Sequence, residues 1–326
     1  MPESPLKRIL SLGRAFWDSQ VLLTAVNLKI FDNLQDFVTA DKVTNSCKLK
    51  LRPTVMLLDA LSSLKILEKK SDKYCVSQQF APFLISKSEK NVLSILNHYY
   101  FMYEDWGQLK EAVKTDKPVD KKEKSPEQFY EFIRGMDNLT KFYRDRLVKA
   151  IDVSGAKKFL DIGSGPATYL REILKANKAI TGYILDLPEA TKVAKEFLAK
   201  EGLQNRVKFI KGDIETTDIG SGYDIILISQ VLHSLSPEAV KAAFKKAFSA
   251  LKTNGRLYIH EFYLNETRTF PEENVVFCLN MLLHSKGGNN FTVSELKKLY
   301  KEAGFKNLHV TKFKKPYTVL INGEKP

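Results

Sequence analysis

In the second half of the chain, short apolar runs alternate with stretches that carry apolar residues at helical spacing. The runs occupy residues 159–162, 180–185, 207–210 and 225–228, and each is followed by glycine or a polar residue. A continuous apolar run of this length is typical of a strand that is buried on both faces of a parallel sheet. The alternation of such strands with helices therefore predicts an α/β domain.

The first half of the chain has the pattern of a small, mainly helical domain. Apolar residues recur at helical spacing over residues 6–34, which predicts one or two amphipathic helices. Residues 39–80 predict two helices and a hairpin, which is the order of a winged helix. Thr39 caps the first of these helices, and Pro53 marks the start of the second.

The segment between these two regions predicts a connection. Residues 114–124 are charged and lack an apolar period, so they predict an exposed loop. Ser125-Pro126-Glu127-Gln128 is a capping box, and we expect its helix to run through Leu147 and to bridge the domains. We thus divide the chain into a helical winged-helix domain (1–105), a linker with the bridging helix (106–150) and the α/β domain (151–326).

The turn after the first apolar run has the residues of a nucleotide-binding turn. Gly163 and Gly165 precede a predicted helix, and glycine lets the main chain approach a ligand closely. Asp186 and Asp213 follow the next two runs, so all four residues are expected at the carboxyl edge of the sheet. There Asp186 can accept hydrogen bonds from two ribose hydroxyls, and Asp213 can meet the amino edge of an adenine.

This series of glycines and acids resembles the class I S-adenosylmethionine-dependent methyltransferases. Two further stretches, Leu232-His233-Ser234-Leu235-Ser236-Pro237-Glu238 and Gly287-Gly288-Asn289-Asn290-Phe291-Thr292, resemble the small-molecule O-methyltransferases of the caffeic acid and hydroxyindole type. The resemblance spans most of the chain. It implies a seven-stranded, Rossmann-like methyltransferase domain preceded by a winged-helix dimerisation domain. A predicted hairpin of residues 308–313 and 317–322 fits the reversed seventh strand of that fold.

The resemblance also implies a cofactor, an acceptor and a homodimer. The methyl donor would be S-adenosylmethionine, and the acceptor would be a hydroxyl of a small, aromatic molecule. The implied cofactor-binding residues are Asp161, Gly163, Gly165, Asp186, Leu187, Asp213, Ile214 and Ser229. The implied acceptor-binding residues are Phe132, Met136, Met281, His284 and Asn290.

His233 is the candidate general base. The sulfonium donor is already activated, so the enzyme has to align the reacting atoms, exclude water and remove the acceptor proton. A phenol has a pKa near ~10 and imidazole near ~6.5, so a neutral imidazole can take the proton as the oxygen attacks. By resemblance, Glu261 orients His233, and a second acid of the family falls at Asn290. Asn290 carries no charge, which weakens the expected stabilisation of protonated His233.

Other functions fit the motifs less well. A dinucleotide dehydrogenase would have glycine at Thr168, the third position of its fingerprint. DNA binding by the winged helix is disfavoured because residues 52–64 are mainly apolar, which favours a dimer interface instead. Enzymes that methylate amino groups of DNA carry Asn or Asp and two prolines after the fourth strand, where this chain reads Ser229-Gln230-Val231-Leu232. A C-methyltransferase on the same scaffold stays open.

Composition adds few constraints. The net charge is +13, but the lysines are scattered and no arginine-rich tract occurs, so we expect a solvated surface rather than a nucleic-acid footprint. Cys47, Cys75 and Cys278 are widely spaced, which predicts free thiols and no metal site. Residues 1–17 lack a signal-peptide pattern and no apolar stretch could span a bilayer, so we expect a cytoplasmic protein without membrane contact.

Overall fold

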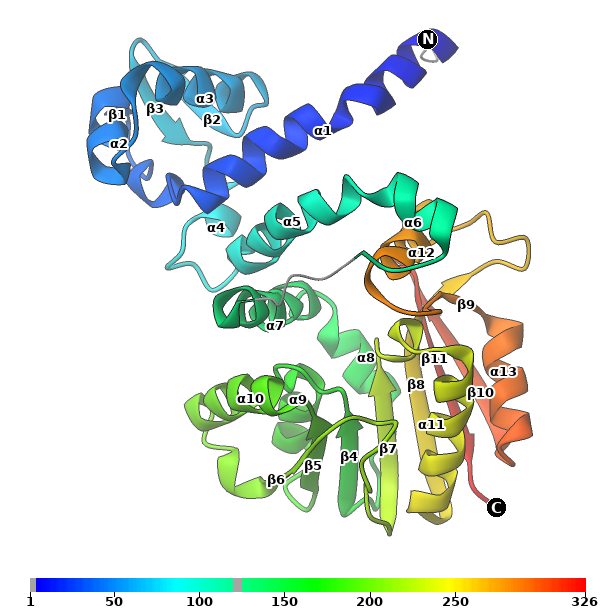
Figure 1. Cartoon of the computed structure of the whole chain (residues 1–326). Coiled ribbons are helices and arrows are strands. Elements are labelled where there is room, and N and C mark those ends of the chain that lie inside the picture. The colour runs from blue at the N-terminus through cyan, green and yellow to red at the C-terminus, as the bar shows by residue number, and fades with distance from the viewer. Residues whose placement is uncertain (1–3, 120–124) are drawn as a thin grey trace. The chain divides into compact units, whose positions relative to one another are not determined.

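The computed structural model describes residues 4–119 and 125–326, which form two compact units (Figure 1). The N-terminal unit ends at Tyr103, and the C-terminal unit begins at Glu104. Within the described residues, no helix combines the length and the apolar character needed to cross a membrane.

The N-terminal unit contains the winged helix that the sequence predicts. Its elements are α1 (Pro5–Asn27), β1 (Val38–Thr39), α2 (Ala40–Cys47), α3 (Leu51–Ser63), β2 (Leu67–Lys70), β3 (Lys73–Val76), α4 (Ala81–Leu84) and most of α5 (Leu93–Trp106). β3 lies between β1 and β2 in an antiparallel sheet. α3 begins two residues before Pro53, because proline is tolerated in a first turn, where its missing N–H would have no helical partner.

Helix α1 buries only the end that packs on its own unit. Ala25 and Val26 join the core of the winged helix. Toward the N-terminus, the helix extends away from that core (Figure 1), and its large apolar residues there are exposed. These residues are Leu6, Ile9, Leu10, Leu12, Phe16 and Trp17. A contiguous apolar surface of this kind indicates a contact with another chain.

The C-terminal unit is a sheet between two layers of helices. The helices are α6 (Leu109–Thr115), α7 (Pro126–Thr140), α8 (Arg144–Ala150), α9 (Thr168–Ala176), α10 (Pro188–Lys200), α11 (Pro237–Ala250), α12 (Glu272–His284) and α13 (Val293–Glu302). The strands are β4 (Lys158–Ile162), β5 (Thr181–Asp186), β6 (Val207–Lys211), β7 (Tyr223–Ser229), β8 (Leu251–Leu264), β9 (Phe291–Thr292), β10 (Lys306–Phe313) and β11 (Thr318–Glu324).

The strand order confirms the expected methyltransferase topology. The order is β6-β5-β4-β7-β8-β11-β10, and β9 pairs with the end of β8. β4 to β8 pair in parallel, whereas β11 is antiparallel to both of its neighbours and is the reversed strand. The carboxyl ends of β4, β5 and β7 therefore meet at one edge of the sheet, where α/β proteins bind their ligands.

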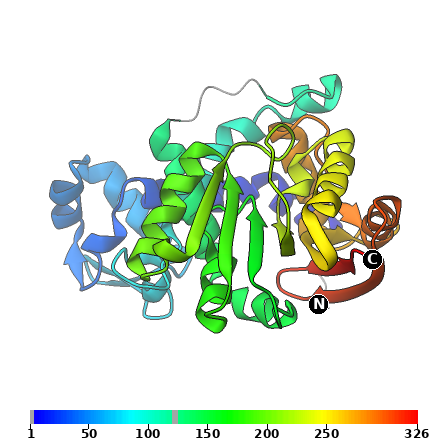
Figure 2. The ribbon, with the colours of Figure 1, turned by 90° about the horizontal axis from the view of Figure 1, so that it is seen from below.

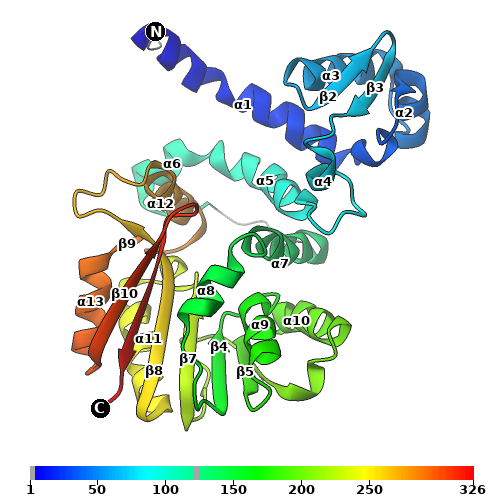
Figure 3. The same cartoon turned by 180° about the vertical axis from the view of Figure 1, so that it is seen from behind.

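Alternating side chains give the sheet two buried faces. On β7, Ile226 and Ile228 pack with α11 and α13, while Ile225 and Leu227 pack with α8, α9 and α10. Figure 1 shows α11 in front of β8, Figure 3 shows α8 and α9 over the opposite face, and Figure 2 shows the layers from below. Because both faces are covered, chemistry is confined to the edge of the sheet.

The predicted bridging helix is wrong in its length. Its capping box at Ser125 is confirmed, but α7 ends at Thr140 and α8 begins at Arg144. Between them the N–H of Tyr143 donates to the carbonyl of Thr140, a bond that spans three residues instead of four. Phe142, which the apolar spacing placed on the buried face, is half exposed. The apolar stripe is therefore interrupted where the helix breaks.

The predicted loop over residues 114–124 is also only partly right. α6 extends through Thr115, and Val119 is buried rather than exposed. The Val119 N–H donates to the carbonyl of Leu283 at 3.0 Å, and its side chain packs with Leu283 and Ala112. Residues 120–124 lie outside the described part of the chain.

Candidate active site

The turn after β4 is built around two glycines. Gly163 has a φ of +67°, and a Cβ on it would lie 2.3 Å from Cγ2 of Val231, so the turn packs directly against the segment after β7. Gly165 has a φ of +53°, and a Cβ there would meet no atom within 4 Å. The main chain at Gly165 is thus open to a ligand.

Two carboxyl groups flank this turn. Asp186 accepts hydrogen bonds from the N–H of Gly165 (2.7 Å) and from that of Leu187 (2.8 Å), and burial raises its pKa. Asp161 is buried and accepts a bond from the Ser164 hydroxyl at 2.6 Å. Burial raises the pKa of Asp161 to about 7, and the nearby charge of Asp186 adds to the rise. Both carboxyl groups keep lone pairs for further donors.

The other predicted cofactor residues lie at neighbouring strand ends. Asp213 is exposed, and one of its oxygens accepts the N–H of Glu215. Leu187 is half exposed, and Ile214 is buried. The acceptor oxygens of Asp186 and Asp213 match the hydroxyl and amino donors of a nucleoside, so the residues fit S-adenosylmethionine.

Ser229 is the last residue of β7, and its side chain contacts His260 rather than His233, the predicted base. Its hydroxyl lies 2.9 Å from Nδ1 of His260, which is buried. Burial lowers the pKa of His260 to about 3, so its imidazole is neutral. The ring makes edge contacts with Tyr169 and Phe313. His260 is thus held inside the unit.

His233 and Glu261 form a buried pair. Nδ1 of His233 donates to Oε2 of Glu261 at 2.7 Å. The other oxygen of Glu261 accepts the N–H groups of Val231 (2.9 Å) and Leu232 (2.7 Å). A carboxylate can only accept, so Nδ1 carries a proton, and in the neutral form of the ring the lone pair lies on Nε2. The carboxylate therefore fixes both the ring and the turn that carries it.

Aromatic rings and a glycine surround this imidazole. Phe277 of α12 meets the His233 ring edge to face, with centroids 5.2 Å apart, and the Phe262 ring lies 6.1 Å away. A Cβ on Gly288 would lie 2.5 Å from the carbonyl oxygen of His233. The segment before β9 can approach the turn because residue 288 has no side chain. His233 is only 8% exposed, so water has little access to it.

The predicted acceptor residues lie on three segments. Phe132 and Met136 are on α7, where Phe132 packs with Ile133 and residues of α10. Met281 is buried on α12, the helix that carries Phe277. Asn290 is buried, and its amide donates to the carbonyl of Asn274 at 2.7 Å, while its side-chain oxygen has no partner among the described residues.

His284 ends α12 with both ring nitrogens engaged. Nδ1 lies 2.8 Å from the carbonyl oxygen of Asn280, and Nε2 lies 2.9 Å from Oδ2 of Asp105. The described residues therefore occupy both polar atoms with which this ring could contact an acceptor.

Sequence reasoning did not identify Ser164, Val231 and Phe262 as parts of the site. Ser164 is visible in the glycine turn, but its bond to Asp161 depends on how the turn folds back. Val231 reaches Gly163, and Phe262 reaches His233, because β7 and β8 pair with Ser229 opposite His260. No local pattern in the sequence encodes this register.

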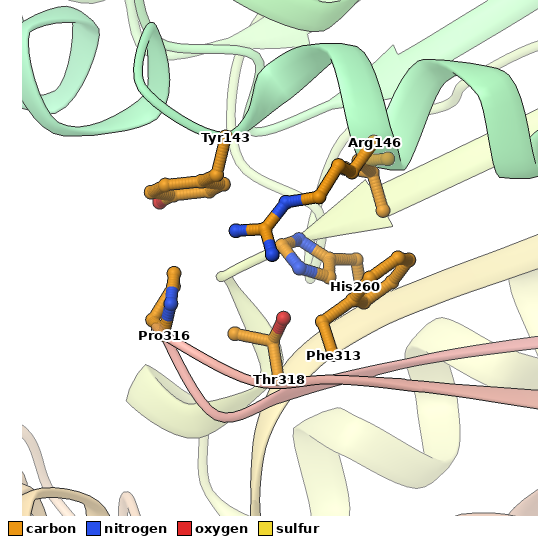
Figure 4. Close-up of a pocket in the computed structure, with 7 residues that line it drawn as sticks. Tyr143, Arg146, His260, Phe313, Pro316 and Thr318 are labelled. Carbon is orange, nitrogen blue, oxygen red and sulfur yellow. The ribbon is translucent and has the colours of Figure 1, made fainter.

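One small hollow is lined in part by His260, the partner of Ser229. Its cavity volume is about 10 Å³, and Figure 4 shows the Arg146 guanidinium and the His260 ring among the side chains that line it. It is lined by Tyr143, Arg146, Leu147, His260, Phe313, Pro316 and Thr318. Ligand pockets usually measure ~300 Å³ or more, so we interpret this hollow as a packing gap.

Comparisons with known proteins agree with the geometry. A family model described as an O-methyltransferase domain matches residues 106–306, and one described as an O-methyltransferase dimerisation domain matches residues 10–82. The S-adenosyl-L-methionine-dependent methyl transferase PigF of a Serratia species is 29% identical, over 95% of this chain and 93% of that protein. The 3-hydroxy-5-methyl-1-naphthoate 3-O-methyltransferase of Streptomyces sahachiroi is 25% identical, over 94% and 91%. A solved structure of PigF with SAH has a TM-score of 0.91 at 27% identity, over 99% of this chain and 100% of that one.

Proposed function

The chain belongs to the S-adenosylmethionine-dependent O-methyltransferase family, and we propose that it methylates a hydroxyl group of a small aromatic molecule with His233 as the general base. The observation that carries this proposal is the 2.7 Å bond between His233 and Glu261, which leaves Nε2 of a buried imidazole able to accept a proton. The aromatic rings beside it suit a flat, apolar acceptor.

The cofactor would be held by residues at the edge of the sheet. Bound S-adenosylmethionine supplies a methyl group on a positively charged sulfur. Asp186 would accept bonds from the ribose hydroxyls, and Asp213 from the adenine amino group. Gly163 and Gly165 let the main chain approach the ligand. Val231 contacts Gly163 and is followed two residues later by His233, so one segment would join the donor and acceptor sides.

His233 would act on the acceptor hydroxyl as the new bond forms. Its Nε2 would take the proton of the acceptor hydroxyl, to which bound S-adenosylmethionine would supply the methyl group. Glu261 then stabilises the imidazolium, because its carboxylate faces Nδ1 at 2.7 Å. The rings of Phe262 and Phe277 exclude water from the reacting atoms. Asn290 occupies the position of the second acid of the family and adds no charge.

The exposed apolar part of α1 supports a homodimer. This helix lies largely within the residues that match the dimerisation domain. A second copy of the chain would cover Phe16, Trp17 and their neighbours, which are exposed in the single chain. Light scattering at micromolar concentration tests this, since the proposal requires a particle of twice the 37.1 kDa chain mass.

The experiment that tests the function uses S-adenosylmethionine with a ¹³C-labelled methyl group. The purified protein is incubated with a panel of phenols and hydroxynaphthoates, and NMR of the product shows whether the methyl group is bound to oxygen or to carbon. The proposal requires methyl ethers from the wild type and little product from His233→Ala. Methyl groups on ring carbon would instead support a C-methyltransferase. No product from any phenol, with normal cofactor binding, would contradict the proposal.

A further inference from the structure

We infer that Asp105 and His284 form a charged clamp that positions α12 over the catalytic histidine and that requires an imidazole with both ring protons. Neither the clamp nor the charge of the ring depends on the proposed function. Only the consequence for acceptor binding rests on the proposed function, because α12 carries the Phe277 ring that covers His233.

The charge of the ring follows from the partners of its two nitrogens. Nδ1 of His284 faces the carbonyl oxygen of Asn280 at 2.8 Å, and Nε2 faces a carboxylate oxygen of Asp105 at 2.9 Å. A carbonyl oxygen and an ionised carboxylate can only accept. A neutral imidazole has one N–H, so one of its nitrogens would direct a lone pair at an oxygen. Only the imidazolium donates to both partners.

The clamp is connected to His233 along one stripe of α12. Phe277, Met281 and His284 are spaced by four and three residues, so they lie on the same side of the helix. At one end of the stripe the Phe277 ring meets His233, and at the other end His284 meets Asp105. Displacement of the His284 end would shift the Phe277 ring that shields the base.

Neighbouring contacts make α12 a stiff connection. The indole N–H of Trp106, next to Asp105, donates to the side-chain oxygen of Asn280 at 3.2 Å. α6 packs on α12 through Ala112 and Leu283, and Figures 1 and 3 show these helices side by side. Because Trp106 follows Asp105 directly, this bond and the clamp join the same segment to the same turn of α12.

Few other charged groups surround the ring. Asp105, on α5, is the charged side chain that bonds to the ring within the described residues. The remaining charged groups of the neighbouring segments are Glu104 beside Asp105, Lys110, Glu111 and Lys114 on α6, Asp116 and Lys117 after it, Glu272 and Glu273 at the far end of α12, Lys286 after the helix, and the His233–Glu261 pair. Glu111 and Lys114 pair with each other at 3.2 Å, and both are exposed. Asp105 therefore dominates the field at the ring.

Asp105→Asn removes the negative charge beside His284 but keeps a side chain that can hydrogen-bond to the ring. An asparagine amide can donate to Nε2, so a neutral imidazole fits that variant with Nδ1–H on Asn280. His284→Gln gives a second test, because its amide can still donate to Asp105 without a titrating group. Lys298→Gln, which removes an exposed pair with Glu302 on α13, is the matched control.

The readout is NMR of the full-length protein, perdeuterated except for protonated, ¹⁵N-labelled histidine and protonated phenylalanine. In the wild type and in Lys298→Gln at neutral pH, both ring nitrogens of His284 should resonate as N–H nitrogens. In Asp105→Asn, one of them should resonate as a bare nitrogen. His284→Gln assigns the signals. A bare ring nitrogen in wild-type His284 at neutral pH would overturn the inference.

The same samples test whether the Asp105–His284 pair positions the Phe277 ring beside His233. The cross-peak between the rings of His233 and Phe277 should be lost in the wild type as the pH is raised until His284 loses a proton. It should persist over that range in Asp105→Asn and in His284→Gln. If the cross-peak survives in the wild type, the pair does not position α12. Neither result requires an acceptor, so failure of the clamp and failure of the proposed methyl transfer are distinguishable.

Discussion

The acceptor side and the cofactor side of the site differ in how many hydrogen bonds the protein itself completes. Glu261, on the acceptor side, is fully buried and accepts three bonds, from His233, Val231 and Leu232. Asp161, on the cofactor side, is almost as buried but accepts one side-chain bond, and its pKa rises to about 7. Three donors stabilise a buried carboxylate far better than one. The proposed acceptor side is thus preorganised, and we expect a ligand to complete the proposed cofactor side.

The largest effect is expected from removal of the base on the preorganised side. Because general base catalysis contributes ~10²- to 10⁴-fold, His233→Ala should lower turnover by such a factor. Its affinity for S-adenosylhomocysteine should stay within about twofold, since His233 lies outside the cofactor residues. Steady-state kinetics and calorimetry give the two numbers. A large loss of cofactor affinity would show that the two sides are not separate.

The next effect concerns stability on the cofactor side. Burial raises the pKa of the Asp161 carboxyl group to about 7 in the folded chain, whereas its pKa in the unfolded chain is near ~3.9. The protonated group therefore stabilises the folded chain fully below pH ~3.9, and this contribution is lost as the pH rises to about 7. The free energy of unfolding of Asp161→Asn relative to wild type should therefore increase over this range, by roughly 4 kcal/mol, and then level off. Urea unfolding of the ligand-free proteins at several pH values measures it. A difference that does not vary with pH would contradict the assigned cause.

A smaller effect is expected for the ribose contacts. Asp186→Ala should lose two charge-assisted bonds to the cofactor and weaken its binding by about 1.5 to 3 kcal/mol, or roughly 10- to 150-fold. Calorimetry with S-adenosylhomocysteine is the measurement. Glu189→Ala, an exposed acid on the next helix, is the control and should bind normally. Unchanged affinity in Asp186→Ala would remove this residue from the cofactor site.

The smallest effect should follow from replacement of the orienting carboxylate. Glu261→Gln cannot accept at all three donors at once, so the His233 ring should lose its fixed tautomer and turnover should fall by about 10- to 100-fold. The fall should be smaller than in His233→Ala, because the base is still present. A Glu261→Gln enzyme as impaired as His233→Ala would show that Glu261 does more than orient the ring.

The sequence predicted the fold well because its patterns are local. The apolar runs, the capping box at Ser125 and the glycine turn each specify where one element begins or ends. The break between α7 and α8 was missed because spacing alone does not show that Phe142 turns toward solvent. The burial of Val119 was missed because it depends on α12, which is distant in the chain.

The candidate site was predictable only in part, for the same reason. The strand ends placed Asp186, Asp213 and His233 at one edge of the sheet, as observed. The partners of His284 could not be predicted, because Asp105 is distant in the sequence and the bond depends on how residues 104–106 pack on α12 within the C-terminal unit. Contacts between distant segments, such as the one between Val231 and Gly163, need the structure.

The role of His233 is tested most directly with phenols of graded acidity. The single-turnover rates of the wild type and of His233→Ala are measured at one pH, with saturating S-adenosylmethionine, for phenols that range from fully protonated to fully ionised. The account predicts that the loss caused by His233→Ala falls from ~10²- to 10⁴-fold for protonated phenols to almost none for ionised ones, because these have no proton to remove. An equal loss for every phenol, or no loss for any, would contradict the assignment of His233 as the general base.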